Sequence, residues 1–358
     1  MTDDKDKKDI DPKAPQAKDA APKAPPAKKA KEPEPEPMEL VVSSSPHLLT
    51  VENIPKIMHN VVLALIPALI ASIYFFGYRA GVLIITCVVA SVVTEIVFQK
   101  ARKQSVTAYD GSAIITGILL ALTLPPSFPI YGAIIGSVFA IGVGKQIFGG
   151  LGFNIFNPAL LGRAFLQATY PVLITTWVEP FKGAVDAVSA ATPLSLMKFE
   201  AEITPLSDLF LGSVSGSLGE TSVIAIIIGG LYLRYKGYIN WKLPLGYLGS
   251  IAGFGALFWL LNPAKYPSPL FHLFAGGAML GAWFMITDMV TSPVTPKGQW
   301  IFVIGAGFLV VIIRLFGGLP EGVMYSILLM NSIVPLLNRW TRPKVFGQIP
   351  KPKAGAAG

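Results

Sequence analysis

Apolar runs of close to twenty residues recur along the chain from Ile57 onward, and short polar segments rich in glycine or proline separate them. A helix needs about 20 apolar residues to cross the hydrocarbon core of a bilayer. We therefore expect an all-α polytopic membrane protein. The pattern predicts ten spans, at residues 57–77, 80–99, 111–124, 129–148, 158–178, 221–235, 243–262, 268–287, 299–317 and 321–338.

Two of these spans are short for a plain crossing. Residues 111–124 end at a proline pair, and the run after Glu220 has only about fifteen residues before Arg234. At about 1.5 Å per residue each covers roughly 21–23 Å of a ~30 Å core. Tilt, local thinning of the bilayer or a broken helix is then needed.

An internal similarity predicts how the spans are arranged. FGGLGFNIFNPALL at 148–161 and FGGLPEGVMYSILL at 316–329 share six of fourteen positions, and GILLALT at 117–123 resembles GAWFMIT at 281–287. The offset equals five spans, an odd number, so the two copies should face opposite ways across the membrane. Inverted five-helix repeats are typical of transport proteins, in which broken helices line an ion or substrate site. The third and eighth spans are the candidates for short or broken helices.

Four polar residues in or beside the apolar runs are candidates for an ion pathway: Asp288, Thr287, Asp110 and Glu95. Ionisable residues inside a membrane are expensive and usually functional. A structural alternative remains for each of them. Asp110, and the Thr287–Asp288 end of the eighth span, could be polar helix ends with capping side chains at the water interface. Glu95, four residues from the end of its span, could snorkel or reach a partner protein.

Arg163 is a third charged residue within an apolar run. It follows Asn157 and Pro158, a combination that indicates a helix start with an asparagine cap and a proline in the first turn. A cation held there could meet a phosphate or a carboxylate of a ligand. A structural salt bridge fits the pattern equally well.

Composition and charge place the segments outside the spans. Of the 358 residues 52% are hydrophobic and 14% charged, with a mean hydropathy of +0.57. Residues 1–45, rich in Lys, Pro, Ala and Glu, are expected to be a disordered cytoplasmic arm. Residues 46–340 form the predicted transmembrane domain and 341–358 a cytoplasmic tail. Thirteen basic loop residues, Lys145 among them, against four predict that both termini lie inside. The basic surplus therefore reflects topology, and no nucleic acid is expected.

Few residues of this chain could hold a redox centre directly. Cys87 is the only cysteine, which excludes an internal disulfide and a four-thiolate iron–sulfur cluster held by this chain alone. The three histidines are dispersed, so no metal site is predicted. The sequence also has no glycine fingerprint for a dinucleotide.

The segment DAVSAATPLSLMK, residues 186–198, interrupts the apolar pattern within residues 179–220, the predicted outer loop between the repeats at 57–178 and 221–338. Spacing alone favours a structural role, with Ser189 capping a turn. The alternative is a modification site. An exposed Thr192 hydroxyl between small side chains leaves room for a phosphoester, and Asp186 could help to hold a metal during attachment.

The segment resembles a recognition motif for flavin transferase, Asp-x-x-(Ser/Thr)-Gly-Ala-(Thr/Ser), and departs from it at Ala190, where glycine is usual. Further stretches occur in the order of one family, that of the D component of the Rnf ion-translocating electron-transport complex, with the B component of the sodium-pumping NADH:quinone reductase as a relative. The similarity covers Ser45 to Arg339. The motifs are TAYDGSAIITGILLALTLPP, GKQIFGGLGFNIFNPALLGRAF, GSLGETS, TDMVTSPVTPKG and EGVMYSILLMNS.

The resemblance implies a bacterial inner-membrane subunit with FMN linked covalently to Thr192, with Ser189 and Asp186 as further motif residues. It implies electron transfer between ferredoxin and NAD coupled to Na⁺ or H⁺ transport, as part of a multisubunit translocase and not as a catalyst alone. Implied partners are other Rnf subunits, one with a second covalent FMN, and a flavin transferase. Ferredoxin and NAD would bind sister subunits. A non-covalent riboflavin is also implied, without assigned residues.

The mechanistic hypothesis is an electron relay through the outer loop, in which the charge of the flavin biases two inverted halves and changes access to an ion site near Asp288 and Thr287. Three alternatives remain: the B component of the quinone reductase, a stand-alone channel or carrier for a small solute, and a scaffold protein without redox work. The sequence does not distinguish Na⁺ from H⁺.

Overall fold

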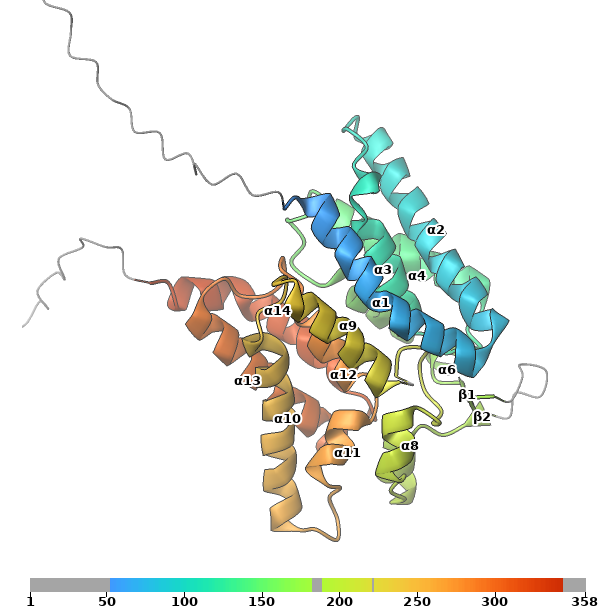
Figure 1. The fold of residues 1–358 in the computed structure, drawn as a ribbon, viewed down its shortest axis with the longest axis vertical. Helices are drawn as coiled ribbons and strands as arrows, with labels where there is room; N and C mark the ends of the chain where they lie inside the picture. The colour runs from blue at the N-terminus through green and yellow to red at the C-terminus, as the bar shows by residue number, and fades with distance from the viewer. Residues whose placement is uncertain (1–51, 182–188, 221, 344–358) are drawn as a thin grey trace, which may run out of the picture. The chain divides into compact units, whose positions relative to one another are not determined.

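The computed structural model describes residues 52–181, 189–220 and 222–343, and within these ranges the regular secondary structure is helical apart from one two-residue strand pairing. The first half begins with two long helices and continues with shorter ones (Figure 1). Its elements are α1 (Ile54–Phe76), α2 (Tyr78–Ala101), η1 (Ala108–Asp110), α3 (Ser112–Leu122), α4 (Ile130–Ile141), the π-helical turn η2 (Gly142–Gln146) and α5 (Pro158–Thr169).

The second half is helical as well. Its elements are α9 (Val223–Tyr235), α10 (Lys242–Leu261), α11 (Pro269–Phe274), α12 (Ala278–Leu280), the π-helical turn η4 (Gly281–Met285), α13 (Pro296–Phe316) and α14 (Val323–Trp340). A connecting region joins the halves. It contains α6 (Pro171–Ile174), β1 (Trp177–Val178), β2 (Ser189–Ala190), α7 (Pro193–Ser195), the π-helical turn η3 (Leu196–Glu200) and α8 (Leu206–Leu211).

Four helices of the described chain are long and apolar enough to cross a membrane, namely α1, α2, α10 and α13. Their outward faces carry large apolar side chains such as Ile70, Ile85 and Leu260, each more than half exposed. Such a surface suits contact with lipid rather than water. Helices α3, α4 and α9 are apolar but shorter.

The fifth and eighth predicted spans differ from continuous helices. Helix α5 ends at Thr169, nine residues before the predicted end at 178, because Pro171 disfavours helical geometry at Tyr170, which has φ −127° and ψ 58°. The eighth range is divided into α11 and the α12–η4 segment. Gly276, in the break, has φ +67°, a conformation that favours glycine.

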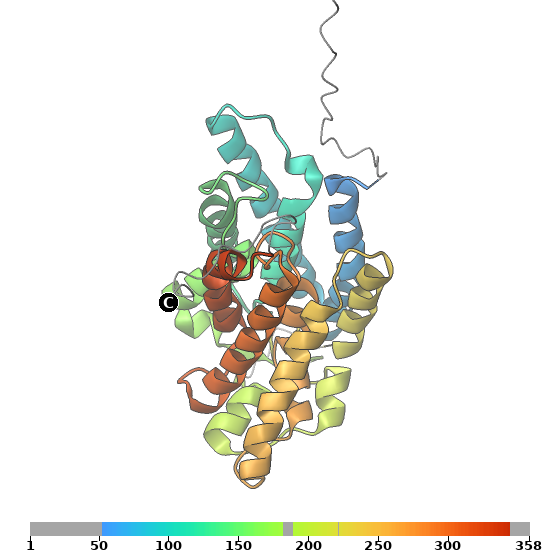
Figure 2. The same ribbon diagram turned by 90° about the vertical axis from the view of Figure 1, so that its left-hand side faces the viewer.

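The two halves meet through pairs of elements that have the same rank in each half. Helix α1 packs on α9, side by side in Figure 1, and α5 packs on α14. A Cβ on Gly229 of α9 would lie 2.0 Å from the Ala64 carbonyl oxygen of α1, so this close approach requires glycine. Within the second half α10 lies along α13, as Figure 2 also shows.

Candidate functional site

A cavity of about 560 Å³ opens beside the connecting region, between the end of α5 and the residues that precede α12 and α14. Its wall includes the β2–α7 segment, residues 190–195, and the turn 318–321. Pockets of 300–1,000 Å³ are typical for organic ligands of moderate size. This cavity is therefore large enough for a cofactor.

Thr192 lies in the wall of this larger cavity and is 7% exposed. It is the N-cap of α7: its Oγ1 accepts a hydrogen bond from the Ser195 backbone N at 3.2 Å and lies 2.9 Å from Ser195 Oγ. The expectation of an exposed hydroxyl is wrong. Pairing of β2 with β1 and burial of Leu194, 1% exposed, draw the segment inward.

Of the other two motif residues, the structure describes Ser189 but not Asp186. Ser189 is the first residue of β2 and pairs with Val178. Asp186 lies outside the described residues, so its relation to Thr192 stays a prediction.

A charged cluster borders the same cavity, with Arg163 and Glu220 buried and Glu321 23% exposed. Arg163 of α5 forms an ion pair with Glu321, whose Oε1 accepts from the Gly277 backbone N at 3.3 Å. Of the alternatives for Arg163, the salt bridge within the chain is present. Glu220 lines the cavity as well, and its buried Oε1 has no hydrogen-bond partner.

The break between α11 and α12 is held open by Arg314 of α13, which is fully buried. Its guanidinium donates to the carbonyl oxygens of His272 at 2.5 Å and Ala275 at 2.8 Å. Carbonyls at the end of a helix have no partner within the helix, and in a water-free interior each must find a donor. Arg314 supplies donors to two of them.

Lys198, on η3, connects the Thr192 segment to the end of α13. Its Nζ donates to the carbonyl oxygens of Ile313 at 3.3 Å, Arg314 at 3.1 Å and Leu319 at 2.9 Å. Burial lowers the pKa of Lys198, because the charged amine loses part of its hydration.

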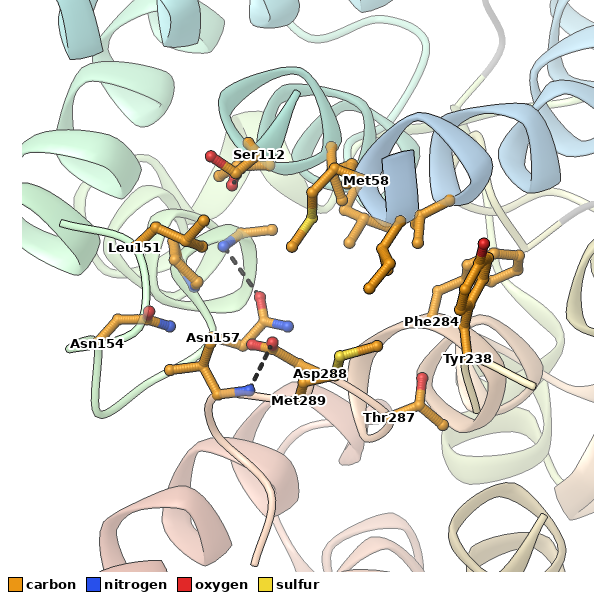
Figure 3. Close-up of a pocket in the computed structure, with 18 of the residues that line it drawn as sticks. Met58, Ser112, Leu151, Asn154, Asn157, Tyr238, Phe284, Thr287, Asp288 and Met289 are labelled. Carbon is orange, nitrogen blue, oxygen red and sulfur yellow. Dashed lines mark hydrogen bonds between the residues drawn. The ribbon is translucent and has the colours of Figure 1, made fainter. Parts of the chain in front are cut away.

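A second, smaller cavity of about 120 Å³ lies where α1, α3 and α5 begin and η4 ends (Figure 3). Thr287 and Asp288 line it, together with Asn157 and Ser112. Asp288 accepts hydrogen bonds from the Val290 backbone N at 3.2 Å and from Thr291 Oγ1 at 3.0 Å. Asn157 caps α5 by accepting from the backbone N of the second and third residues after it, as predicted.

The other two ion-pathway candidates join this cavity through a chain of polar contacts. Asp110 Oδ1 accepts from Ser112 N at 2.8 Å and from Ser112 Oγ at 2.5 Å, so it binds the first residue of α3, whose N-cap is Gly111. Lys145 Nζ donates to Ser112 Oγ at 2.6 Å and to Glu95 Oε1 at 2.7 Å. All four predicted residues therefore lie in one region, either lining the cavity or joined to it through Ser112 and Lys145.

Two interpretations from the sequence are wrong here. Glu95 neither snorkels nor points to a partner, because it is 1% exposed and ion-paired within the chain. Lys145, counted among the loop residues, is 2% exposed in η2. Glu220 and Glu321 were not singled out as site residues. Helical spacing does not predict the ion pairs Glu95–Lys145 and Arg163–Glu321, since the two partners lie 50 residues apart in the first pair and 158 in the second.

Helix α5 contributes to both cavities, since Pro158 borders the smaller cavity and Arg163 the larger one. The α12–η4 segment borders the smaller cavity through Trp283, and Gly276, which precedes α12, borders the larger one. A cavity of about 10 Å³ lies between, lined in part by Thr123 and residues of both segments. In the described ranges no three His, Cys, Asp or Glu residues come together as metal ligands.

Comparison with known proteins gives a consistent result over most of the chain. The model of the NQR2, RnfD, RnfE family matches residues 41–347. The chain is 47% identical over 319 residues to the D component of the proton-translocating ferredoxin:NAD(+) oxidoreductase complex of Clostridium ljungdahlii, covering 86% of this chain and 96% of the relative. It is 48% identical over 314 residues to the D component of the Na(+)-translocating ferredoxin:NAD(+) oxidoreductase complex of Acetobacterium woodii, covering 87% and 96%. The D component of the ion-translocating oxidoreductase complex of Stutzerimonas stutzeri is 40% identical over 328 residues, covering 83% and 93%.

Proposed function

This chain belongs to the NQR2, RnfD, RnfE family, and from that premise we propose that it is the D component of an ion-translocating ferredoxin:NAD oxidoreductase complex and carries FMN covalently on Thr192. The names of the relatives support the complex. The observation that carries the cofactor is that the Thr192 side chain, within the motif, lines a cavity of about 560 Å³.

The residues around Thr192 fit a flavin phosphoester. The cavity volume lies in the range for a cofactor. Trp177 and Phe199 offer aromatic surface in the wall, and Arg163 offers a guanidinium, the side chain best suited to phosphate. A flavin bound there supplies one- and two-electron transfer that no side chain of this chain provides.

The chain's own residues then act by holding and positioning. Thr192 provides the covalent anchor. The strand pairing of β2 and the Lys198 contacts fix the segment that bears it against α13. Leu194 and its buried neighbours keep water away from one side of the cavity. Pinning of this kind limits the range of flavin orientations, on which electron transfer to a partner depends.

For ion transport we propose two inverted five-helix halves with ten membrane-crossing segments. Two features support this: the pairing of α1 with α9 and α5 with α14, and a left-handed glycine shortly before two of the short helices, Gly111 before α3 and Gly276 before α12. The proposed pathway contains Asp288, Thr287, Asp110 and Glu95, and Lys145 already compensates the Glu95 charge.

The proposed topology follows from the charge distribution, with both termini in the cytoplasm, the Thr192 loop outside and the chain in the inner membrane. Proposed partners are sister subunits that bind ferredoxin and NAD, one of them with a second covalent FMN, and a flavin transferase. The non-covalent riboflavin stays a prediction without residues. The coupling ion stays open between Na⁺ and H⁺, since two relatives of nearly equal identity are named for different ions.

The test of the cofactor is flavin fluorescence of the chain in a denaturing gel, after expression with the transferase. The wild-type band is expected to fluoresce and the Thr192→Ala band to be dark. Thr175→Ala is the matched control, because Thr175 lines the same cavity outside the motif, and its band should stay fluorescent. A dark wild-type band refutes the flavoprotein proposal, and a fluorescent Thr192→Ala band refutes the site.

The family also includes the B component of the NADH:quinone reductase. The two complexes are distinguished by the substrate that reacts with NAD or NADH, which is ferredoxin in one complex and quinone in the other. Membranes that contain the wild-type complex should reduce NAD with ferredoxin, and Thr192→Ala should abolish that rate. Quinone reduction by NADH that depends on Thr192, without ferredoxin activity, would assign the chain to the other branch. If the rate of NAD reduction by ferredoxin is unchanged in Thr192→Ala, the chain acts as a scaffold protein without redox work.

A further inference from the structure

We propose that Glu220 and Glu321 form a proton-binding site in the wall of the Thr192 cavity, in which Glu220 carries one exchangeable proton that it shares with Glu321. Both residues line the larger cavity and also the cavity of about 10 Å³ behind it. Their use by a flavin rests on the proposed function, whereas the presence of the proton does not.

The contacts of the two carboxyl groups are unequal. Glu321 has two donors, the Arg163 guanidinium and the Gly277 backbone N. Glu220 is 7% exposed and its Oε1 has no partner. A buried carboxylate without a donor is costly, whereas a protonated carboxyl group is not charged. The asymmetry therefore places the proton on Glu220 and the negative charge on Glu321.

The two side chains also lie close enough to share that proton. Their Oε1 atoms face the same glycine, Gly277, which precedes α12. A Cβ placed on Gly277 would be 3.5 Å from Glu321 Oε1 and 3.6 Å from Glu220 Oε1. Two carboxyl groups can form a hydrogen bond only if one of them holds a proton, and adjacent carboxylates resist double ionisation.

A proton suits this place better than a metal cation. The charged neighbours are Arg163 from α5 and Arg314 from α13, and both repel a cation. The space behind the pair, about 10 Å³, is at the lower limit for a single water molecule. The remaining polar groups near the pair are hydroxyl groups, those of Ser217, of Tyr247 from α10 and of Tyr325 from α14.

The position of the pair gives the proton a use. Glu220 and Glu321 border the cavity that contains Thr192, and Arg163 and Gly277 connect them to α5 and to the start of α12. A proton held there can leave or return when the charge inside the cavity changes. Its movement would also alter the charge beside the helix break that Arg314 stabilises.

The experiment is infrared spectroscopy of the purified full-length chain at neutral pH, in H₂O and in D₂O. The wild type is expected to show a carboxylic acid C=O band that shifts in D₂O and is absent from Glu220→Gln. Glu321→Gln should lose the band as well, because Arg163 then has Glu220 as its only carboxylate and ionises it. Glu202→Gln, at an exposed carboxylate of the connecting region, is the control and should keep the band.

Further outcomes keep the proposal separable from misfolding and from the flavin. Glu220→Asp retains a carboxyl group and should retain a shifted band, and absence of that band would contradict the assignment. A band that persists in Glu220→Gln overturns the site, and a band lost in Glu220→Gln but unchanged in Glu321→Gln overturns the sharing. Thr192→Ala should keep the band, so that failure of the flavin proposal leaves this result intact.

Discussion

Removal of the Lys145 amine tests the buried ion pair that joins η2 to α2. Lys145 Nζ lies 2.7 Å from Glu95 Oε1, and the two side chains are 2% and 1% exposed. In Lys145→Met, Glu95 Oε1 keeps two hydrogen-bond donors, the side-chain amides of Gln146 at 3.0 Å and Gln99 at 3.4 Å. Ser112 Oγ also loses its donor. A carboxylate is then left in the interior without a cation.

Such a break costs about 3–5 kcal/mol, because the uncompensated charge stays buried. That corresponds to roughly a 10²–10⁴-fold rise in the unfolding equilibrium constant. At roughly 2 °C per kcal/mol for a chain of this size, the melting temperature falls by ~6–10 °C. The double variant Lys145→Met with Glu95→Gln removes both charges and should recover most of the loss.

Cys87 provides the assay. It is the only cysteine of the sequence and is fully buried in α2, so a thiol-reactive fluorogenic dye labels it only when the helices separate. The melting temperature in detergent is read from the dye signal. Lys56→Met, which breaks an exposed ion pair, is the control and should show no measurable shift. The reasoning is refuted if Lys145→Met melts with the wild type, or if the double variant melts no higher than the single one.

Three further variants test other contacts with the same dye assay or with proteolysis. Gly229→Ala should lower the free energy of unfolding by about 1–3 kcal/mol through overpacking. The control Gly253→Ala should leave it unchanged, because no atom lies within 4 Å of the new Cβ. Equal melting temperatures of the two variants would contradict the close approach of α1 and α9. Arg314→Lys should be less stable than the wild type, because one amine cannot reproduce the two hydrogen bonds of the guanidinium at the helix break. A wild-type melting temperature of this variant would show that those hydrogen bonds are dispensable. Lys198→Met should speed protease cleavage of the connecting region by releasing three hydrogen bonds, and an unchanged cleavage rate would show that Lys198 does not secure it.

Local patterns predicted the helices and their starts well. The apolar runs coincide with α1, α2, α10 and α13 within a few residues, because length and hydropathy decide those elements. The cap of α5 by Asn157 followed from three adjacent residues. The early end of α5 was also readable in principle, since Pro171 restricts the residue before it, but the apolar run continued past it and obscured the signal.

Contacts between distant segments were not predictable in the same way. Glu95 and Lys145 look like residues at the ends of spans, and nothing in their neighbourhood shows that they meet. The burial of Thr192 depends on the pairing of β2 with β1, and the cluster at Glu220 depends on α5 and on the turn before α14. Sequence spacing reports local periodicity, whereas these features come from the packing of segments that are distant in the sequence.

The buried charges also constrain the order in which the chain can be assembled in the membrane. Lys145 is synthesised after its partner Glu95, and Arg314 is synthesised after the His272 and Ala275 carbonyl groups that it binds. The partners of both cations are therefore already present. Arg163 is different, because Glu321 follows 158 residues later. Until the second half is synthesised, that guanidinium needs a temporary partner such as water, a lipid headgroup or an insertion factor. Completion of the Thr192 cavity is therefore a late event in biogenesis, and the proposed covalent attachment of FMN at Thr192 is expected to follow insertion of the last helix.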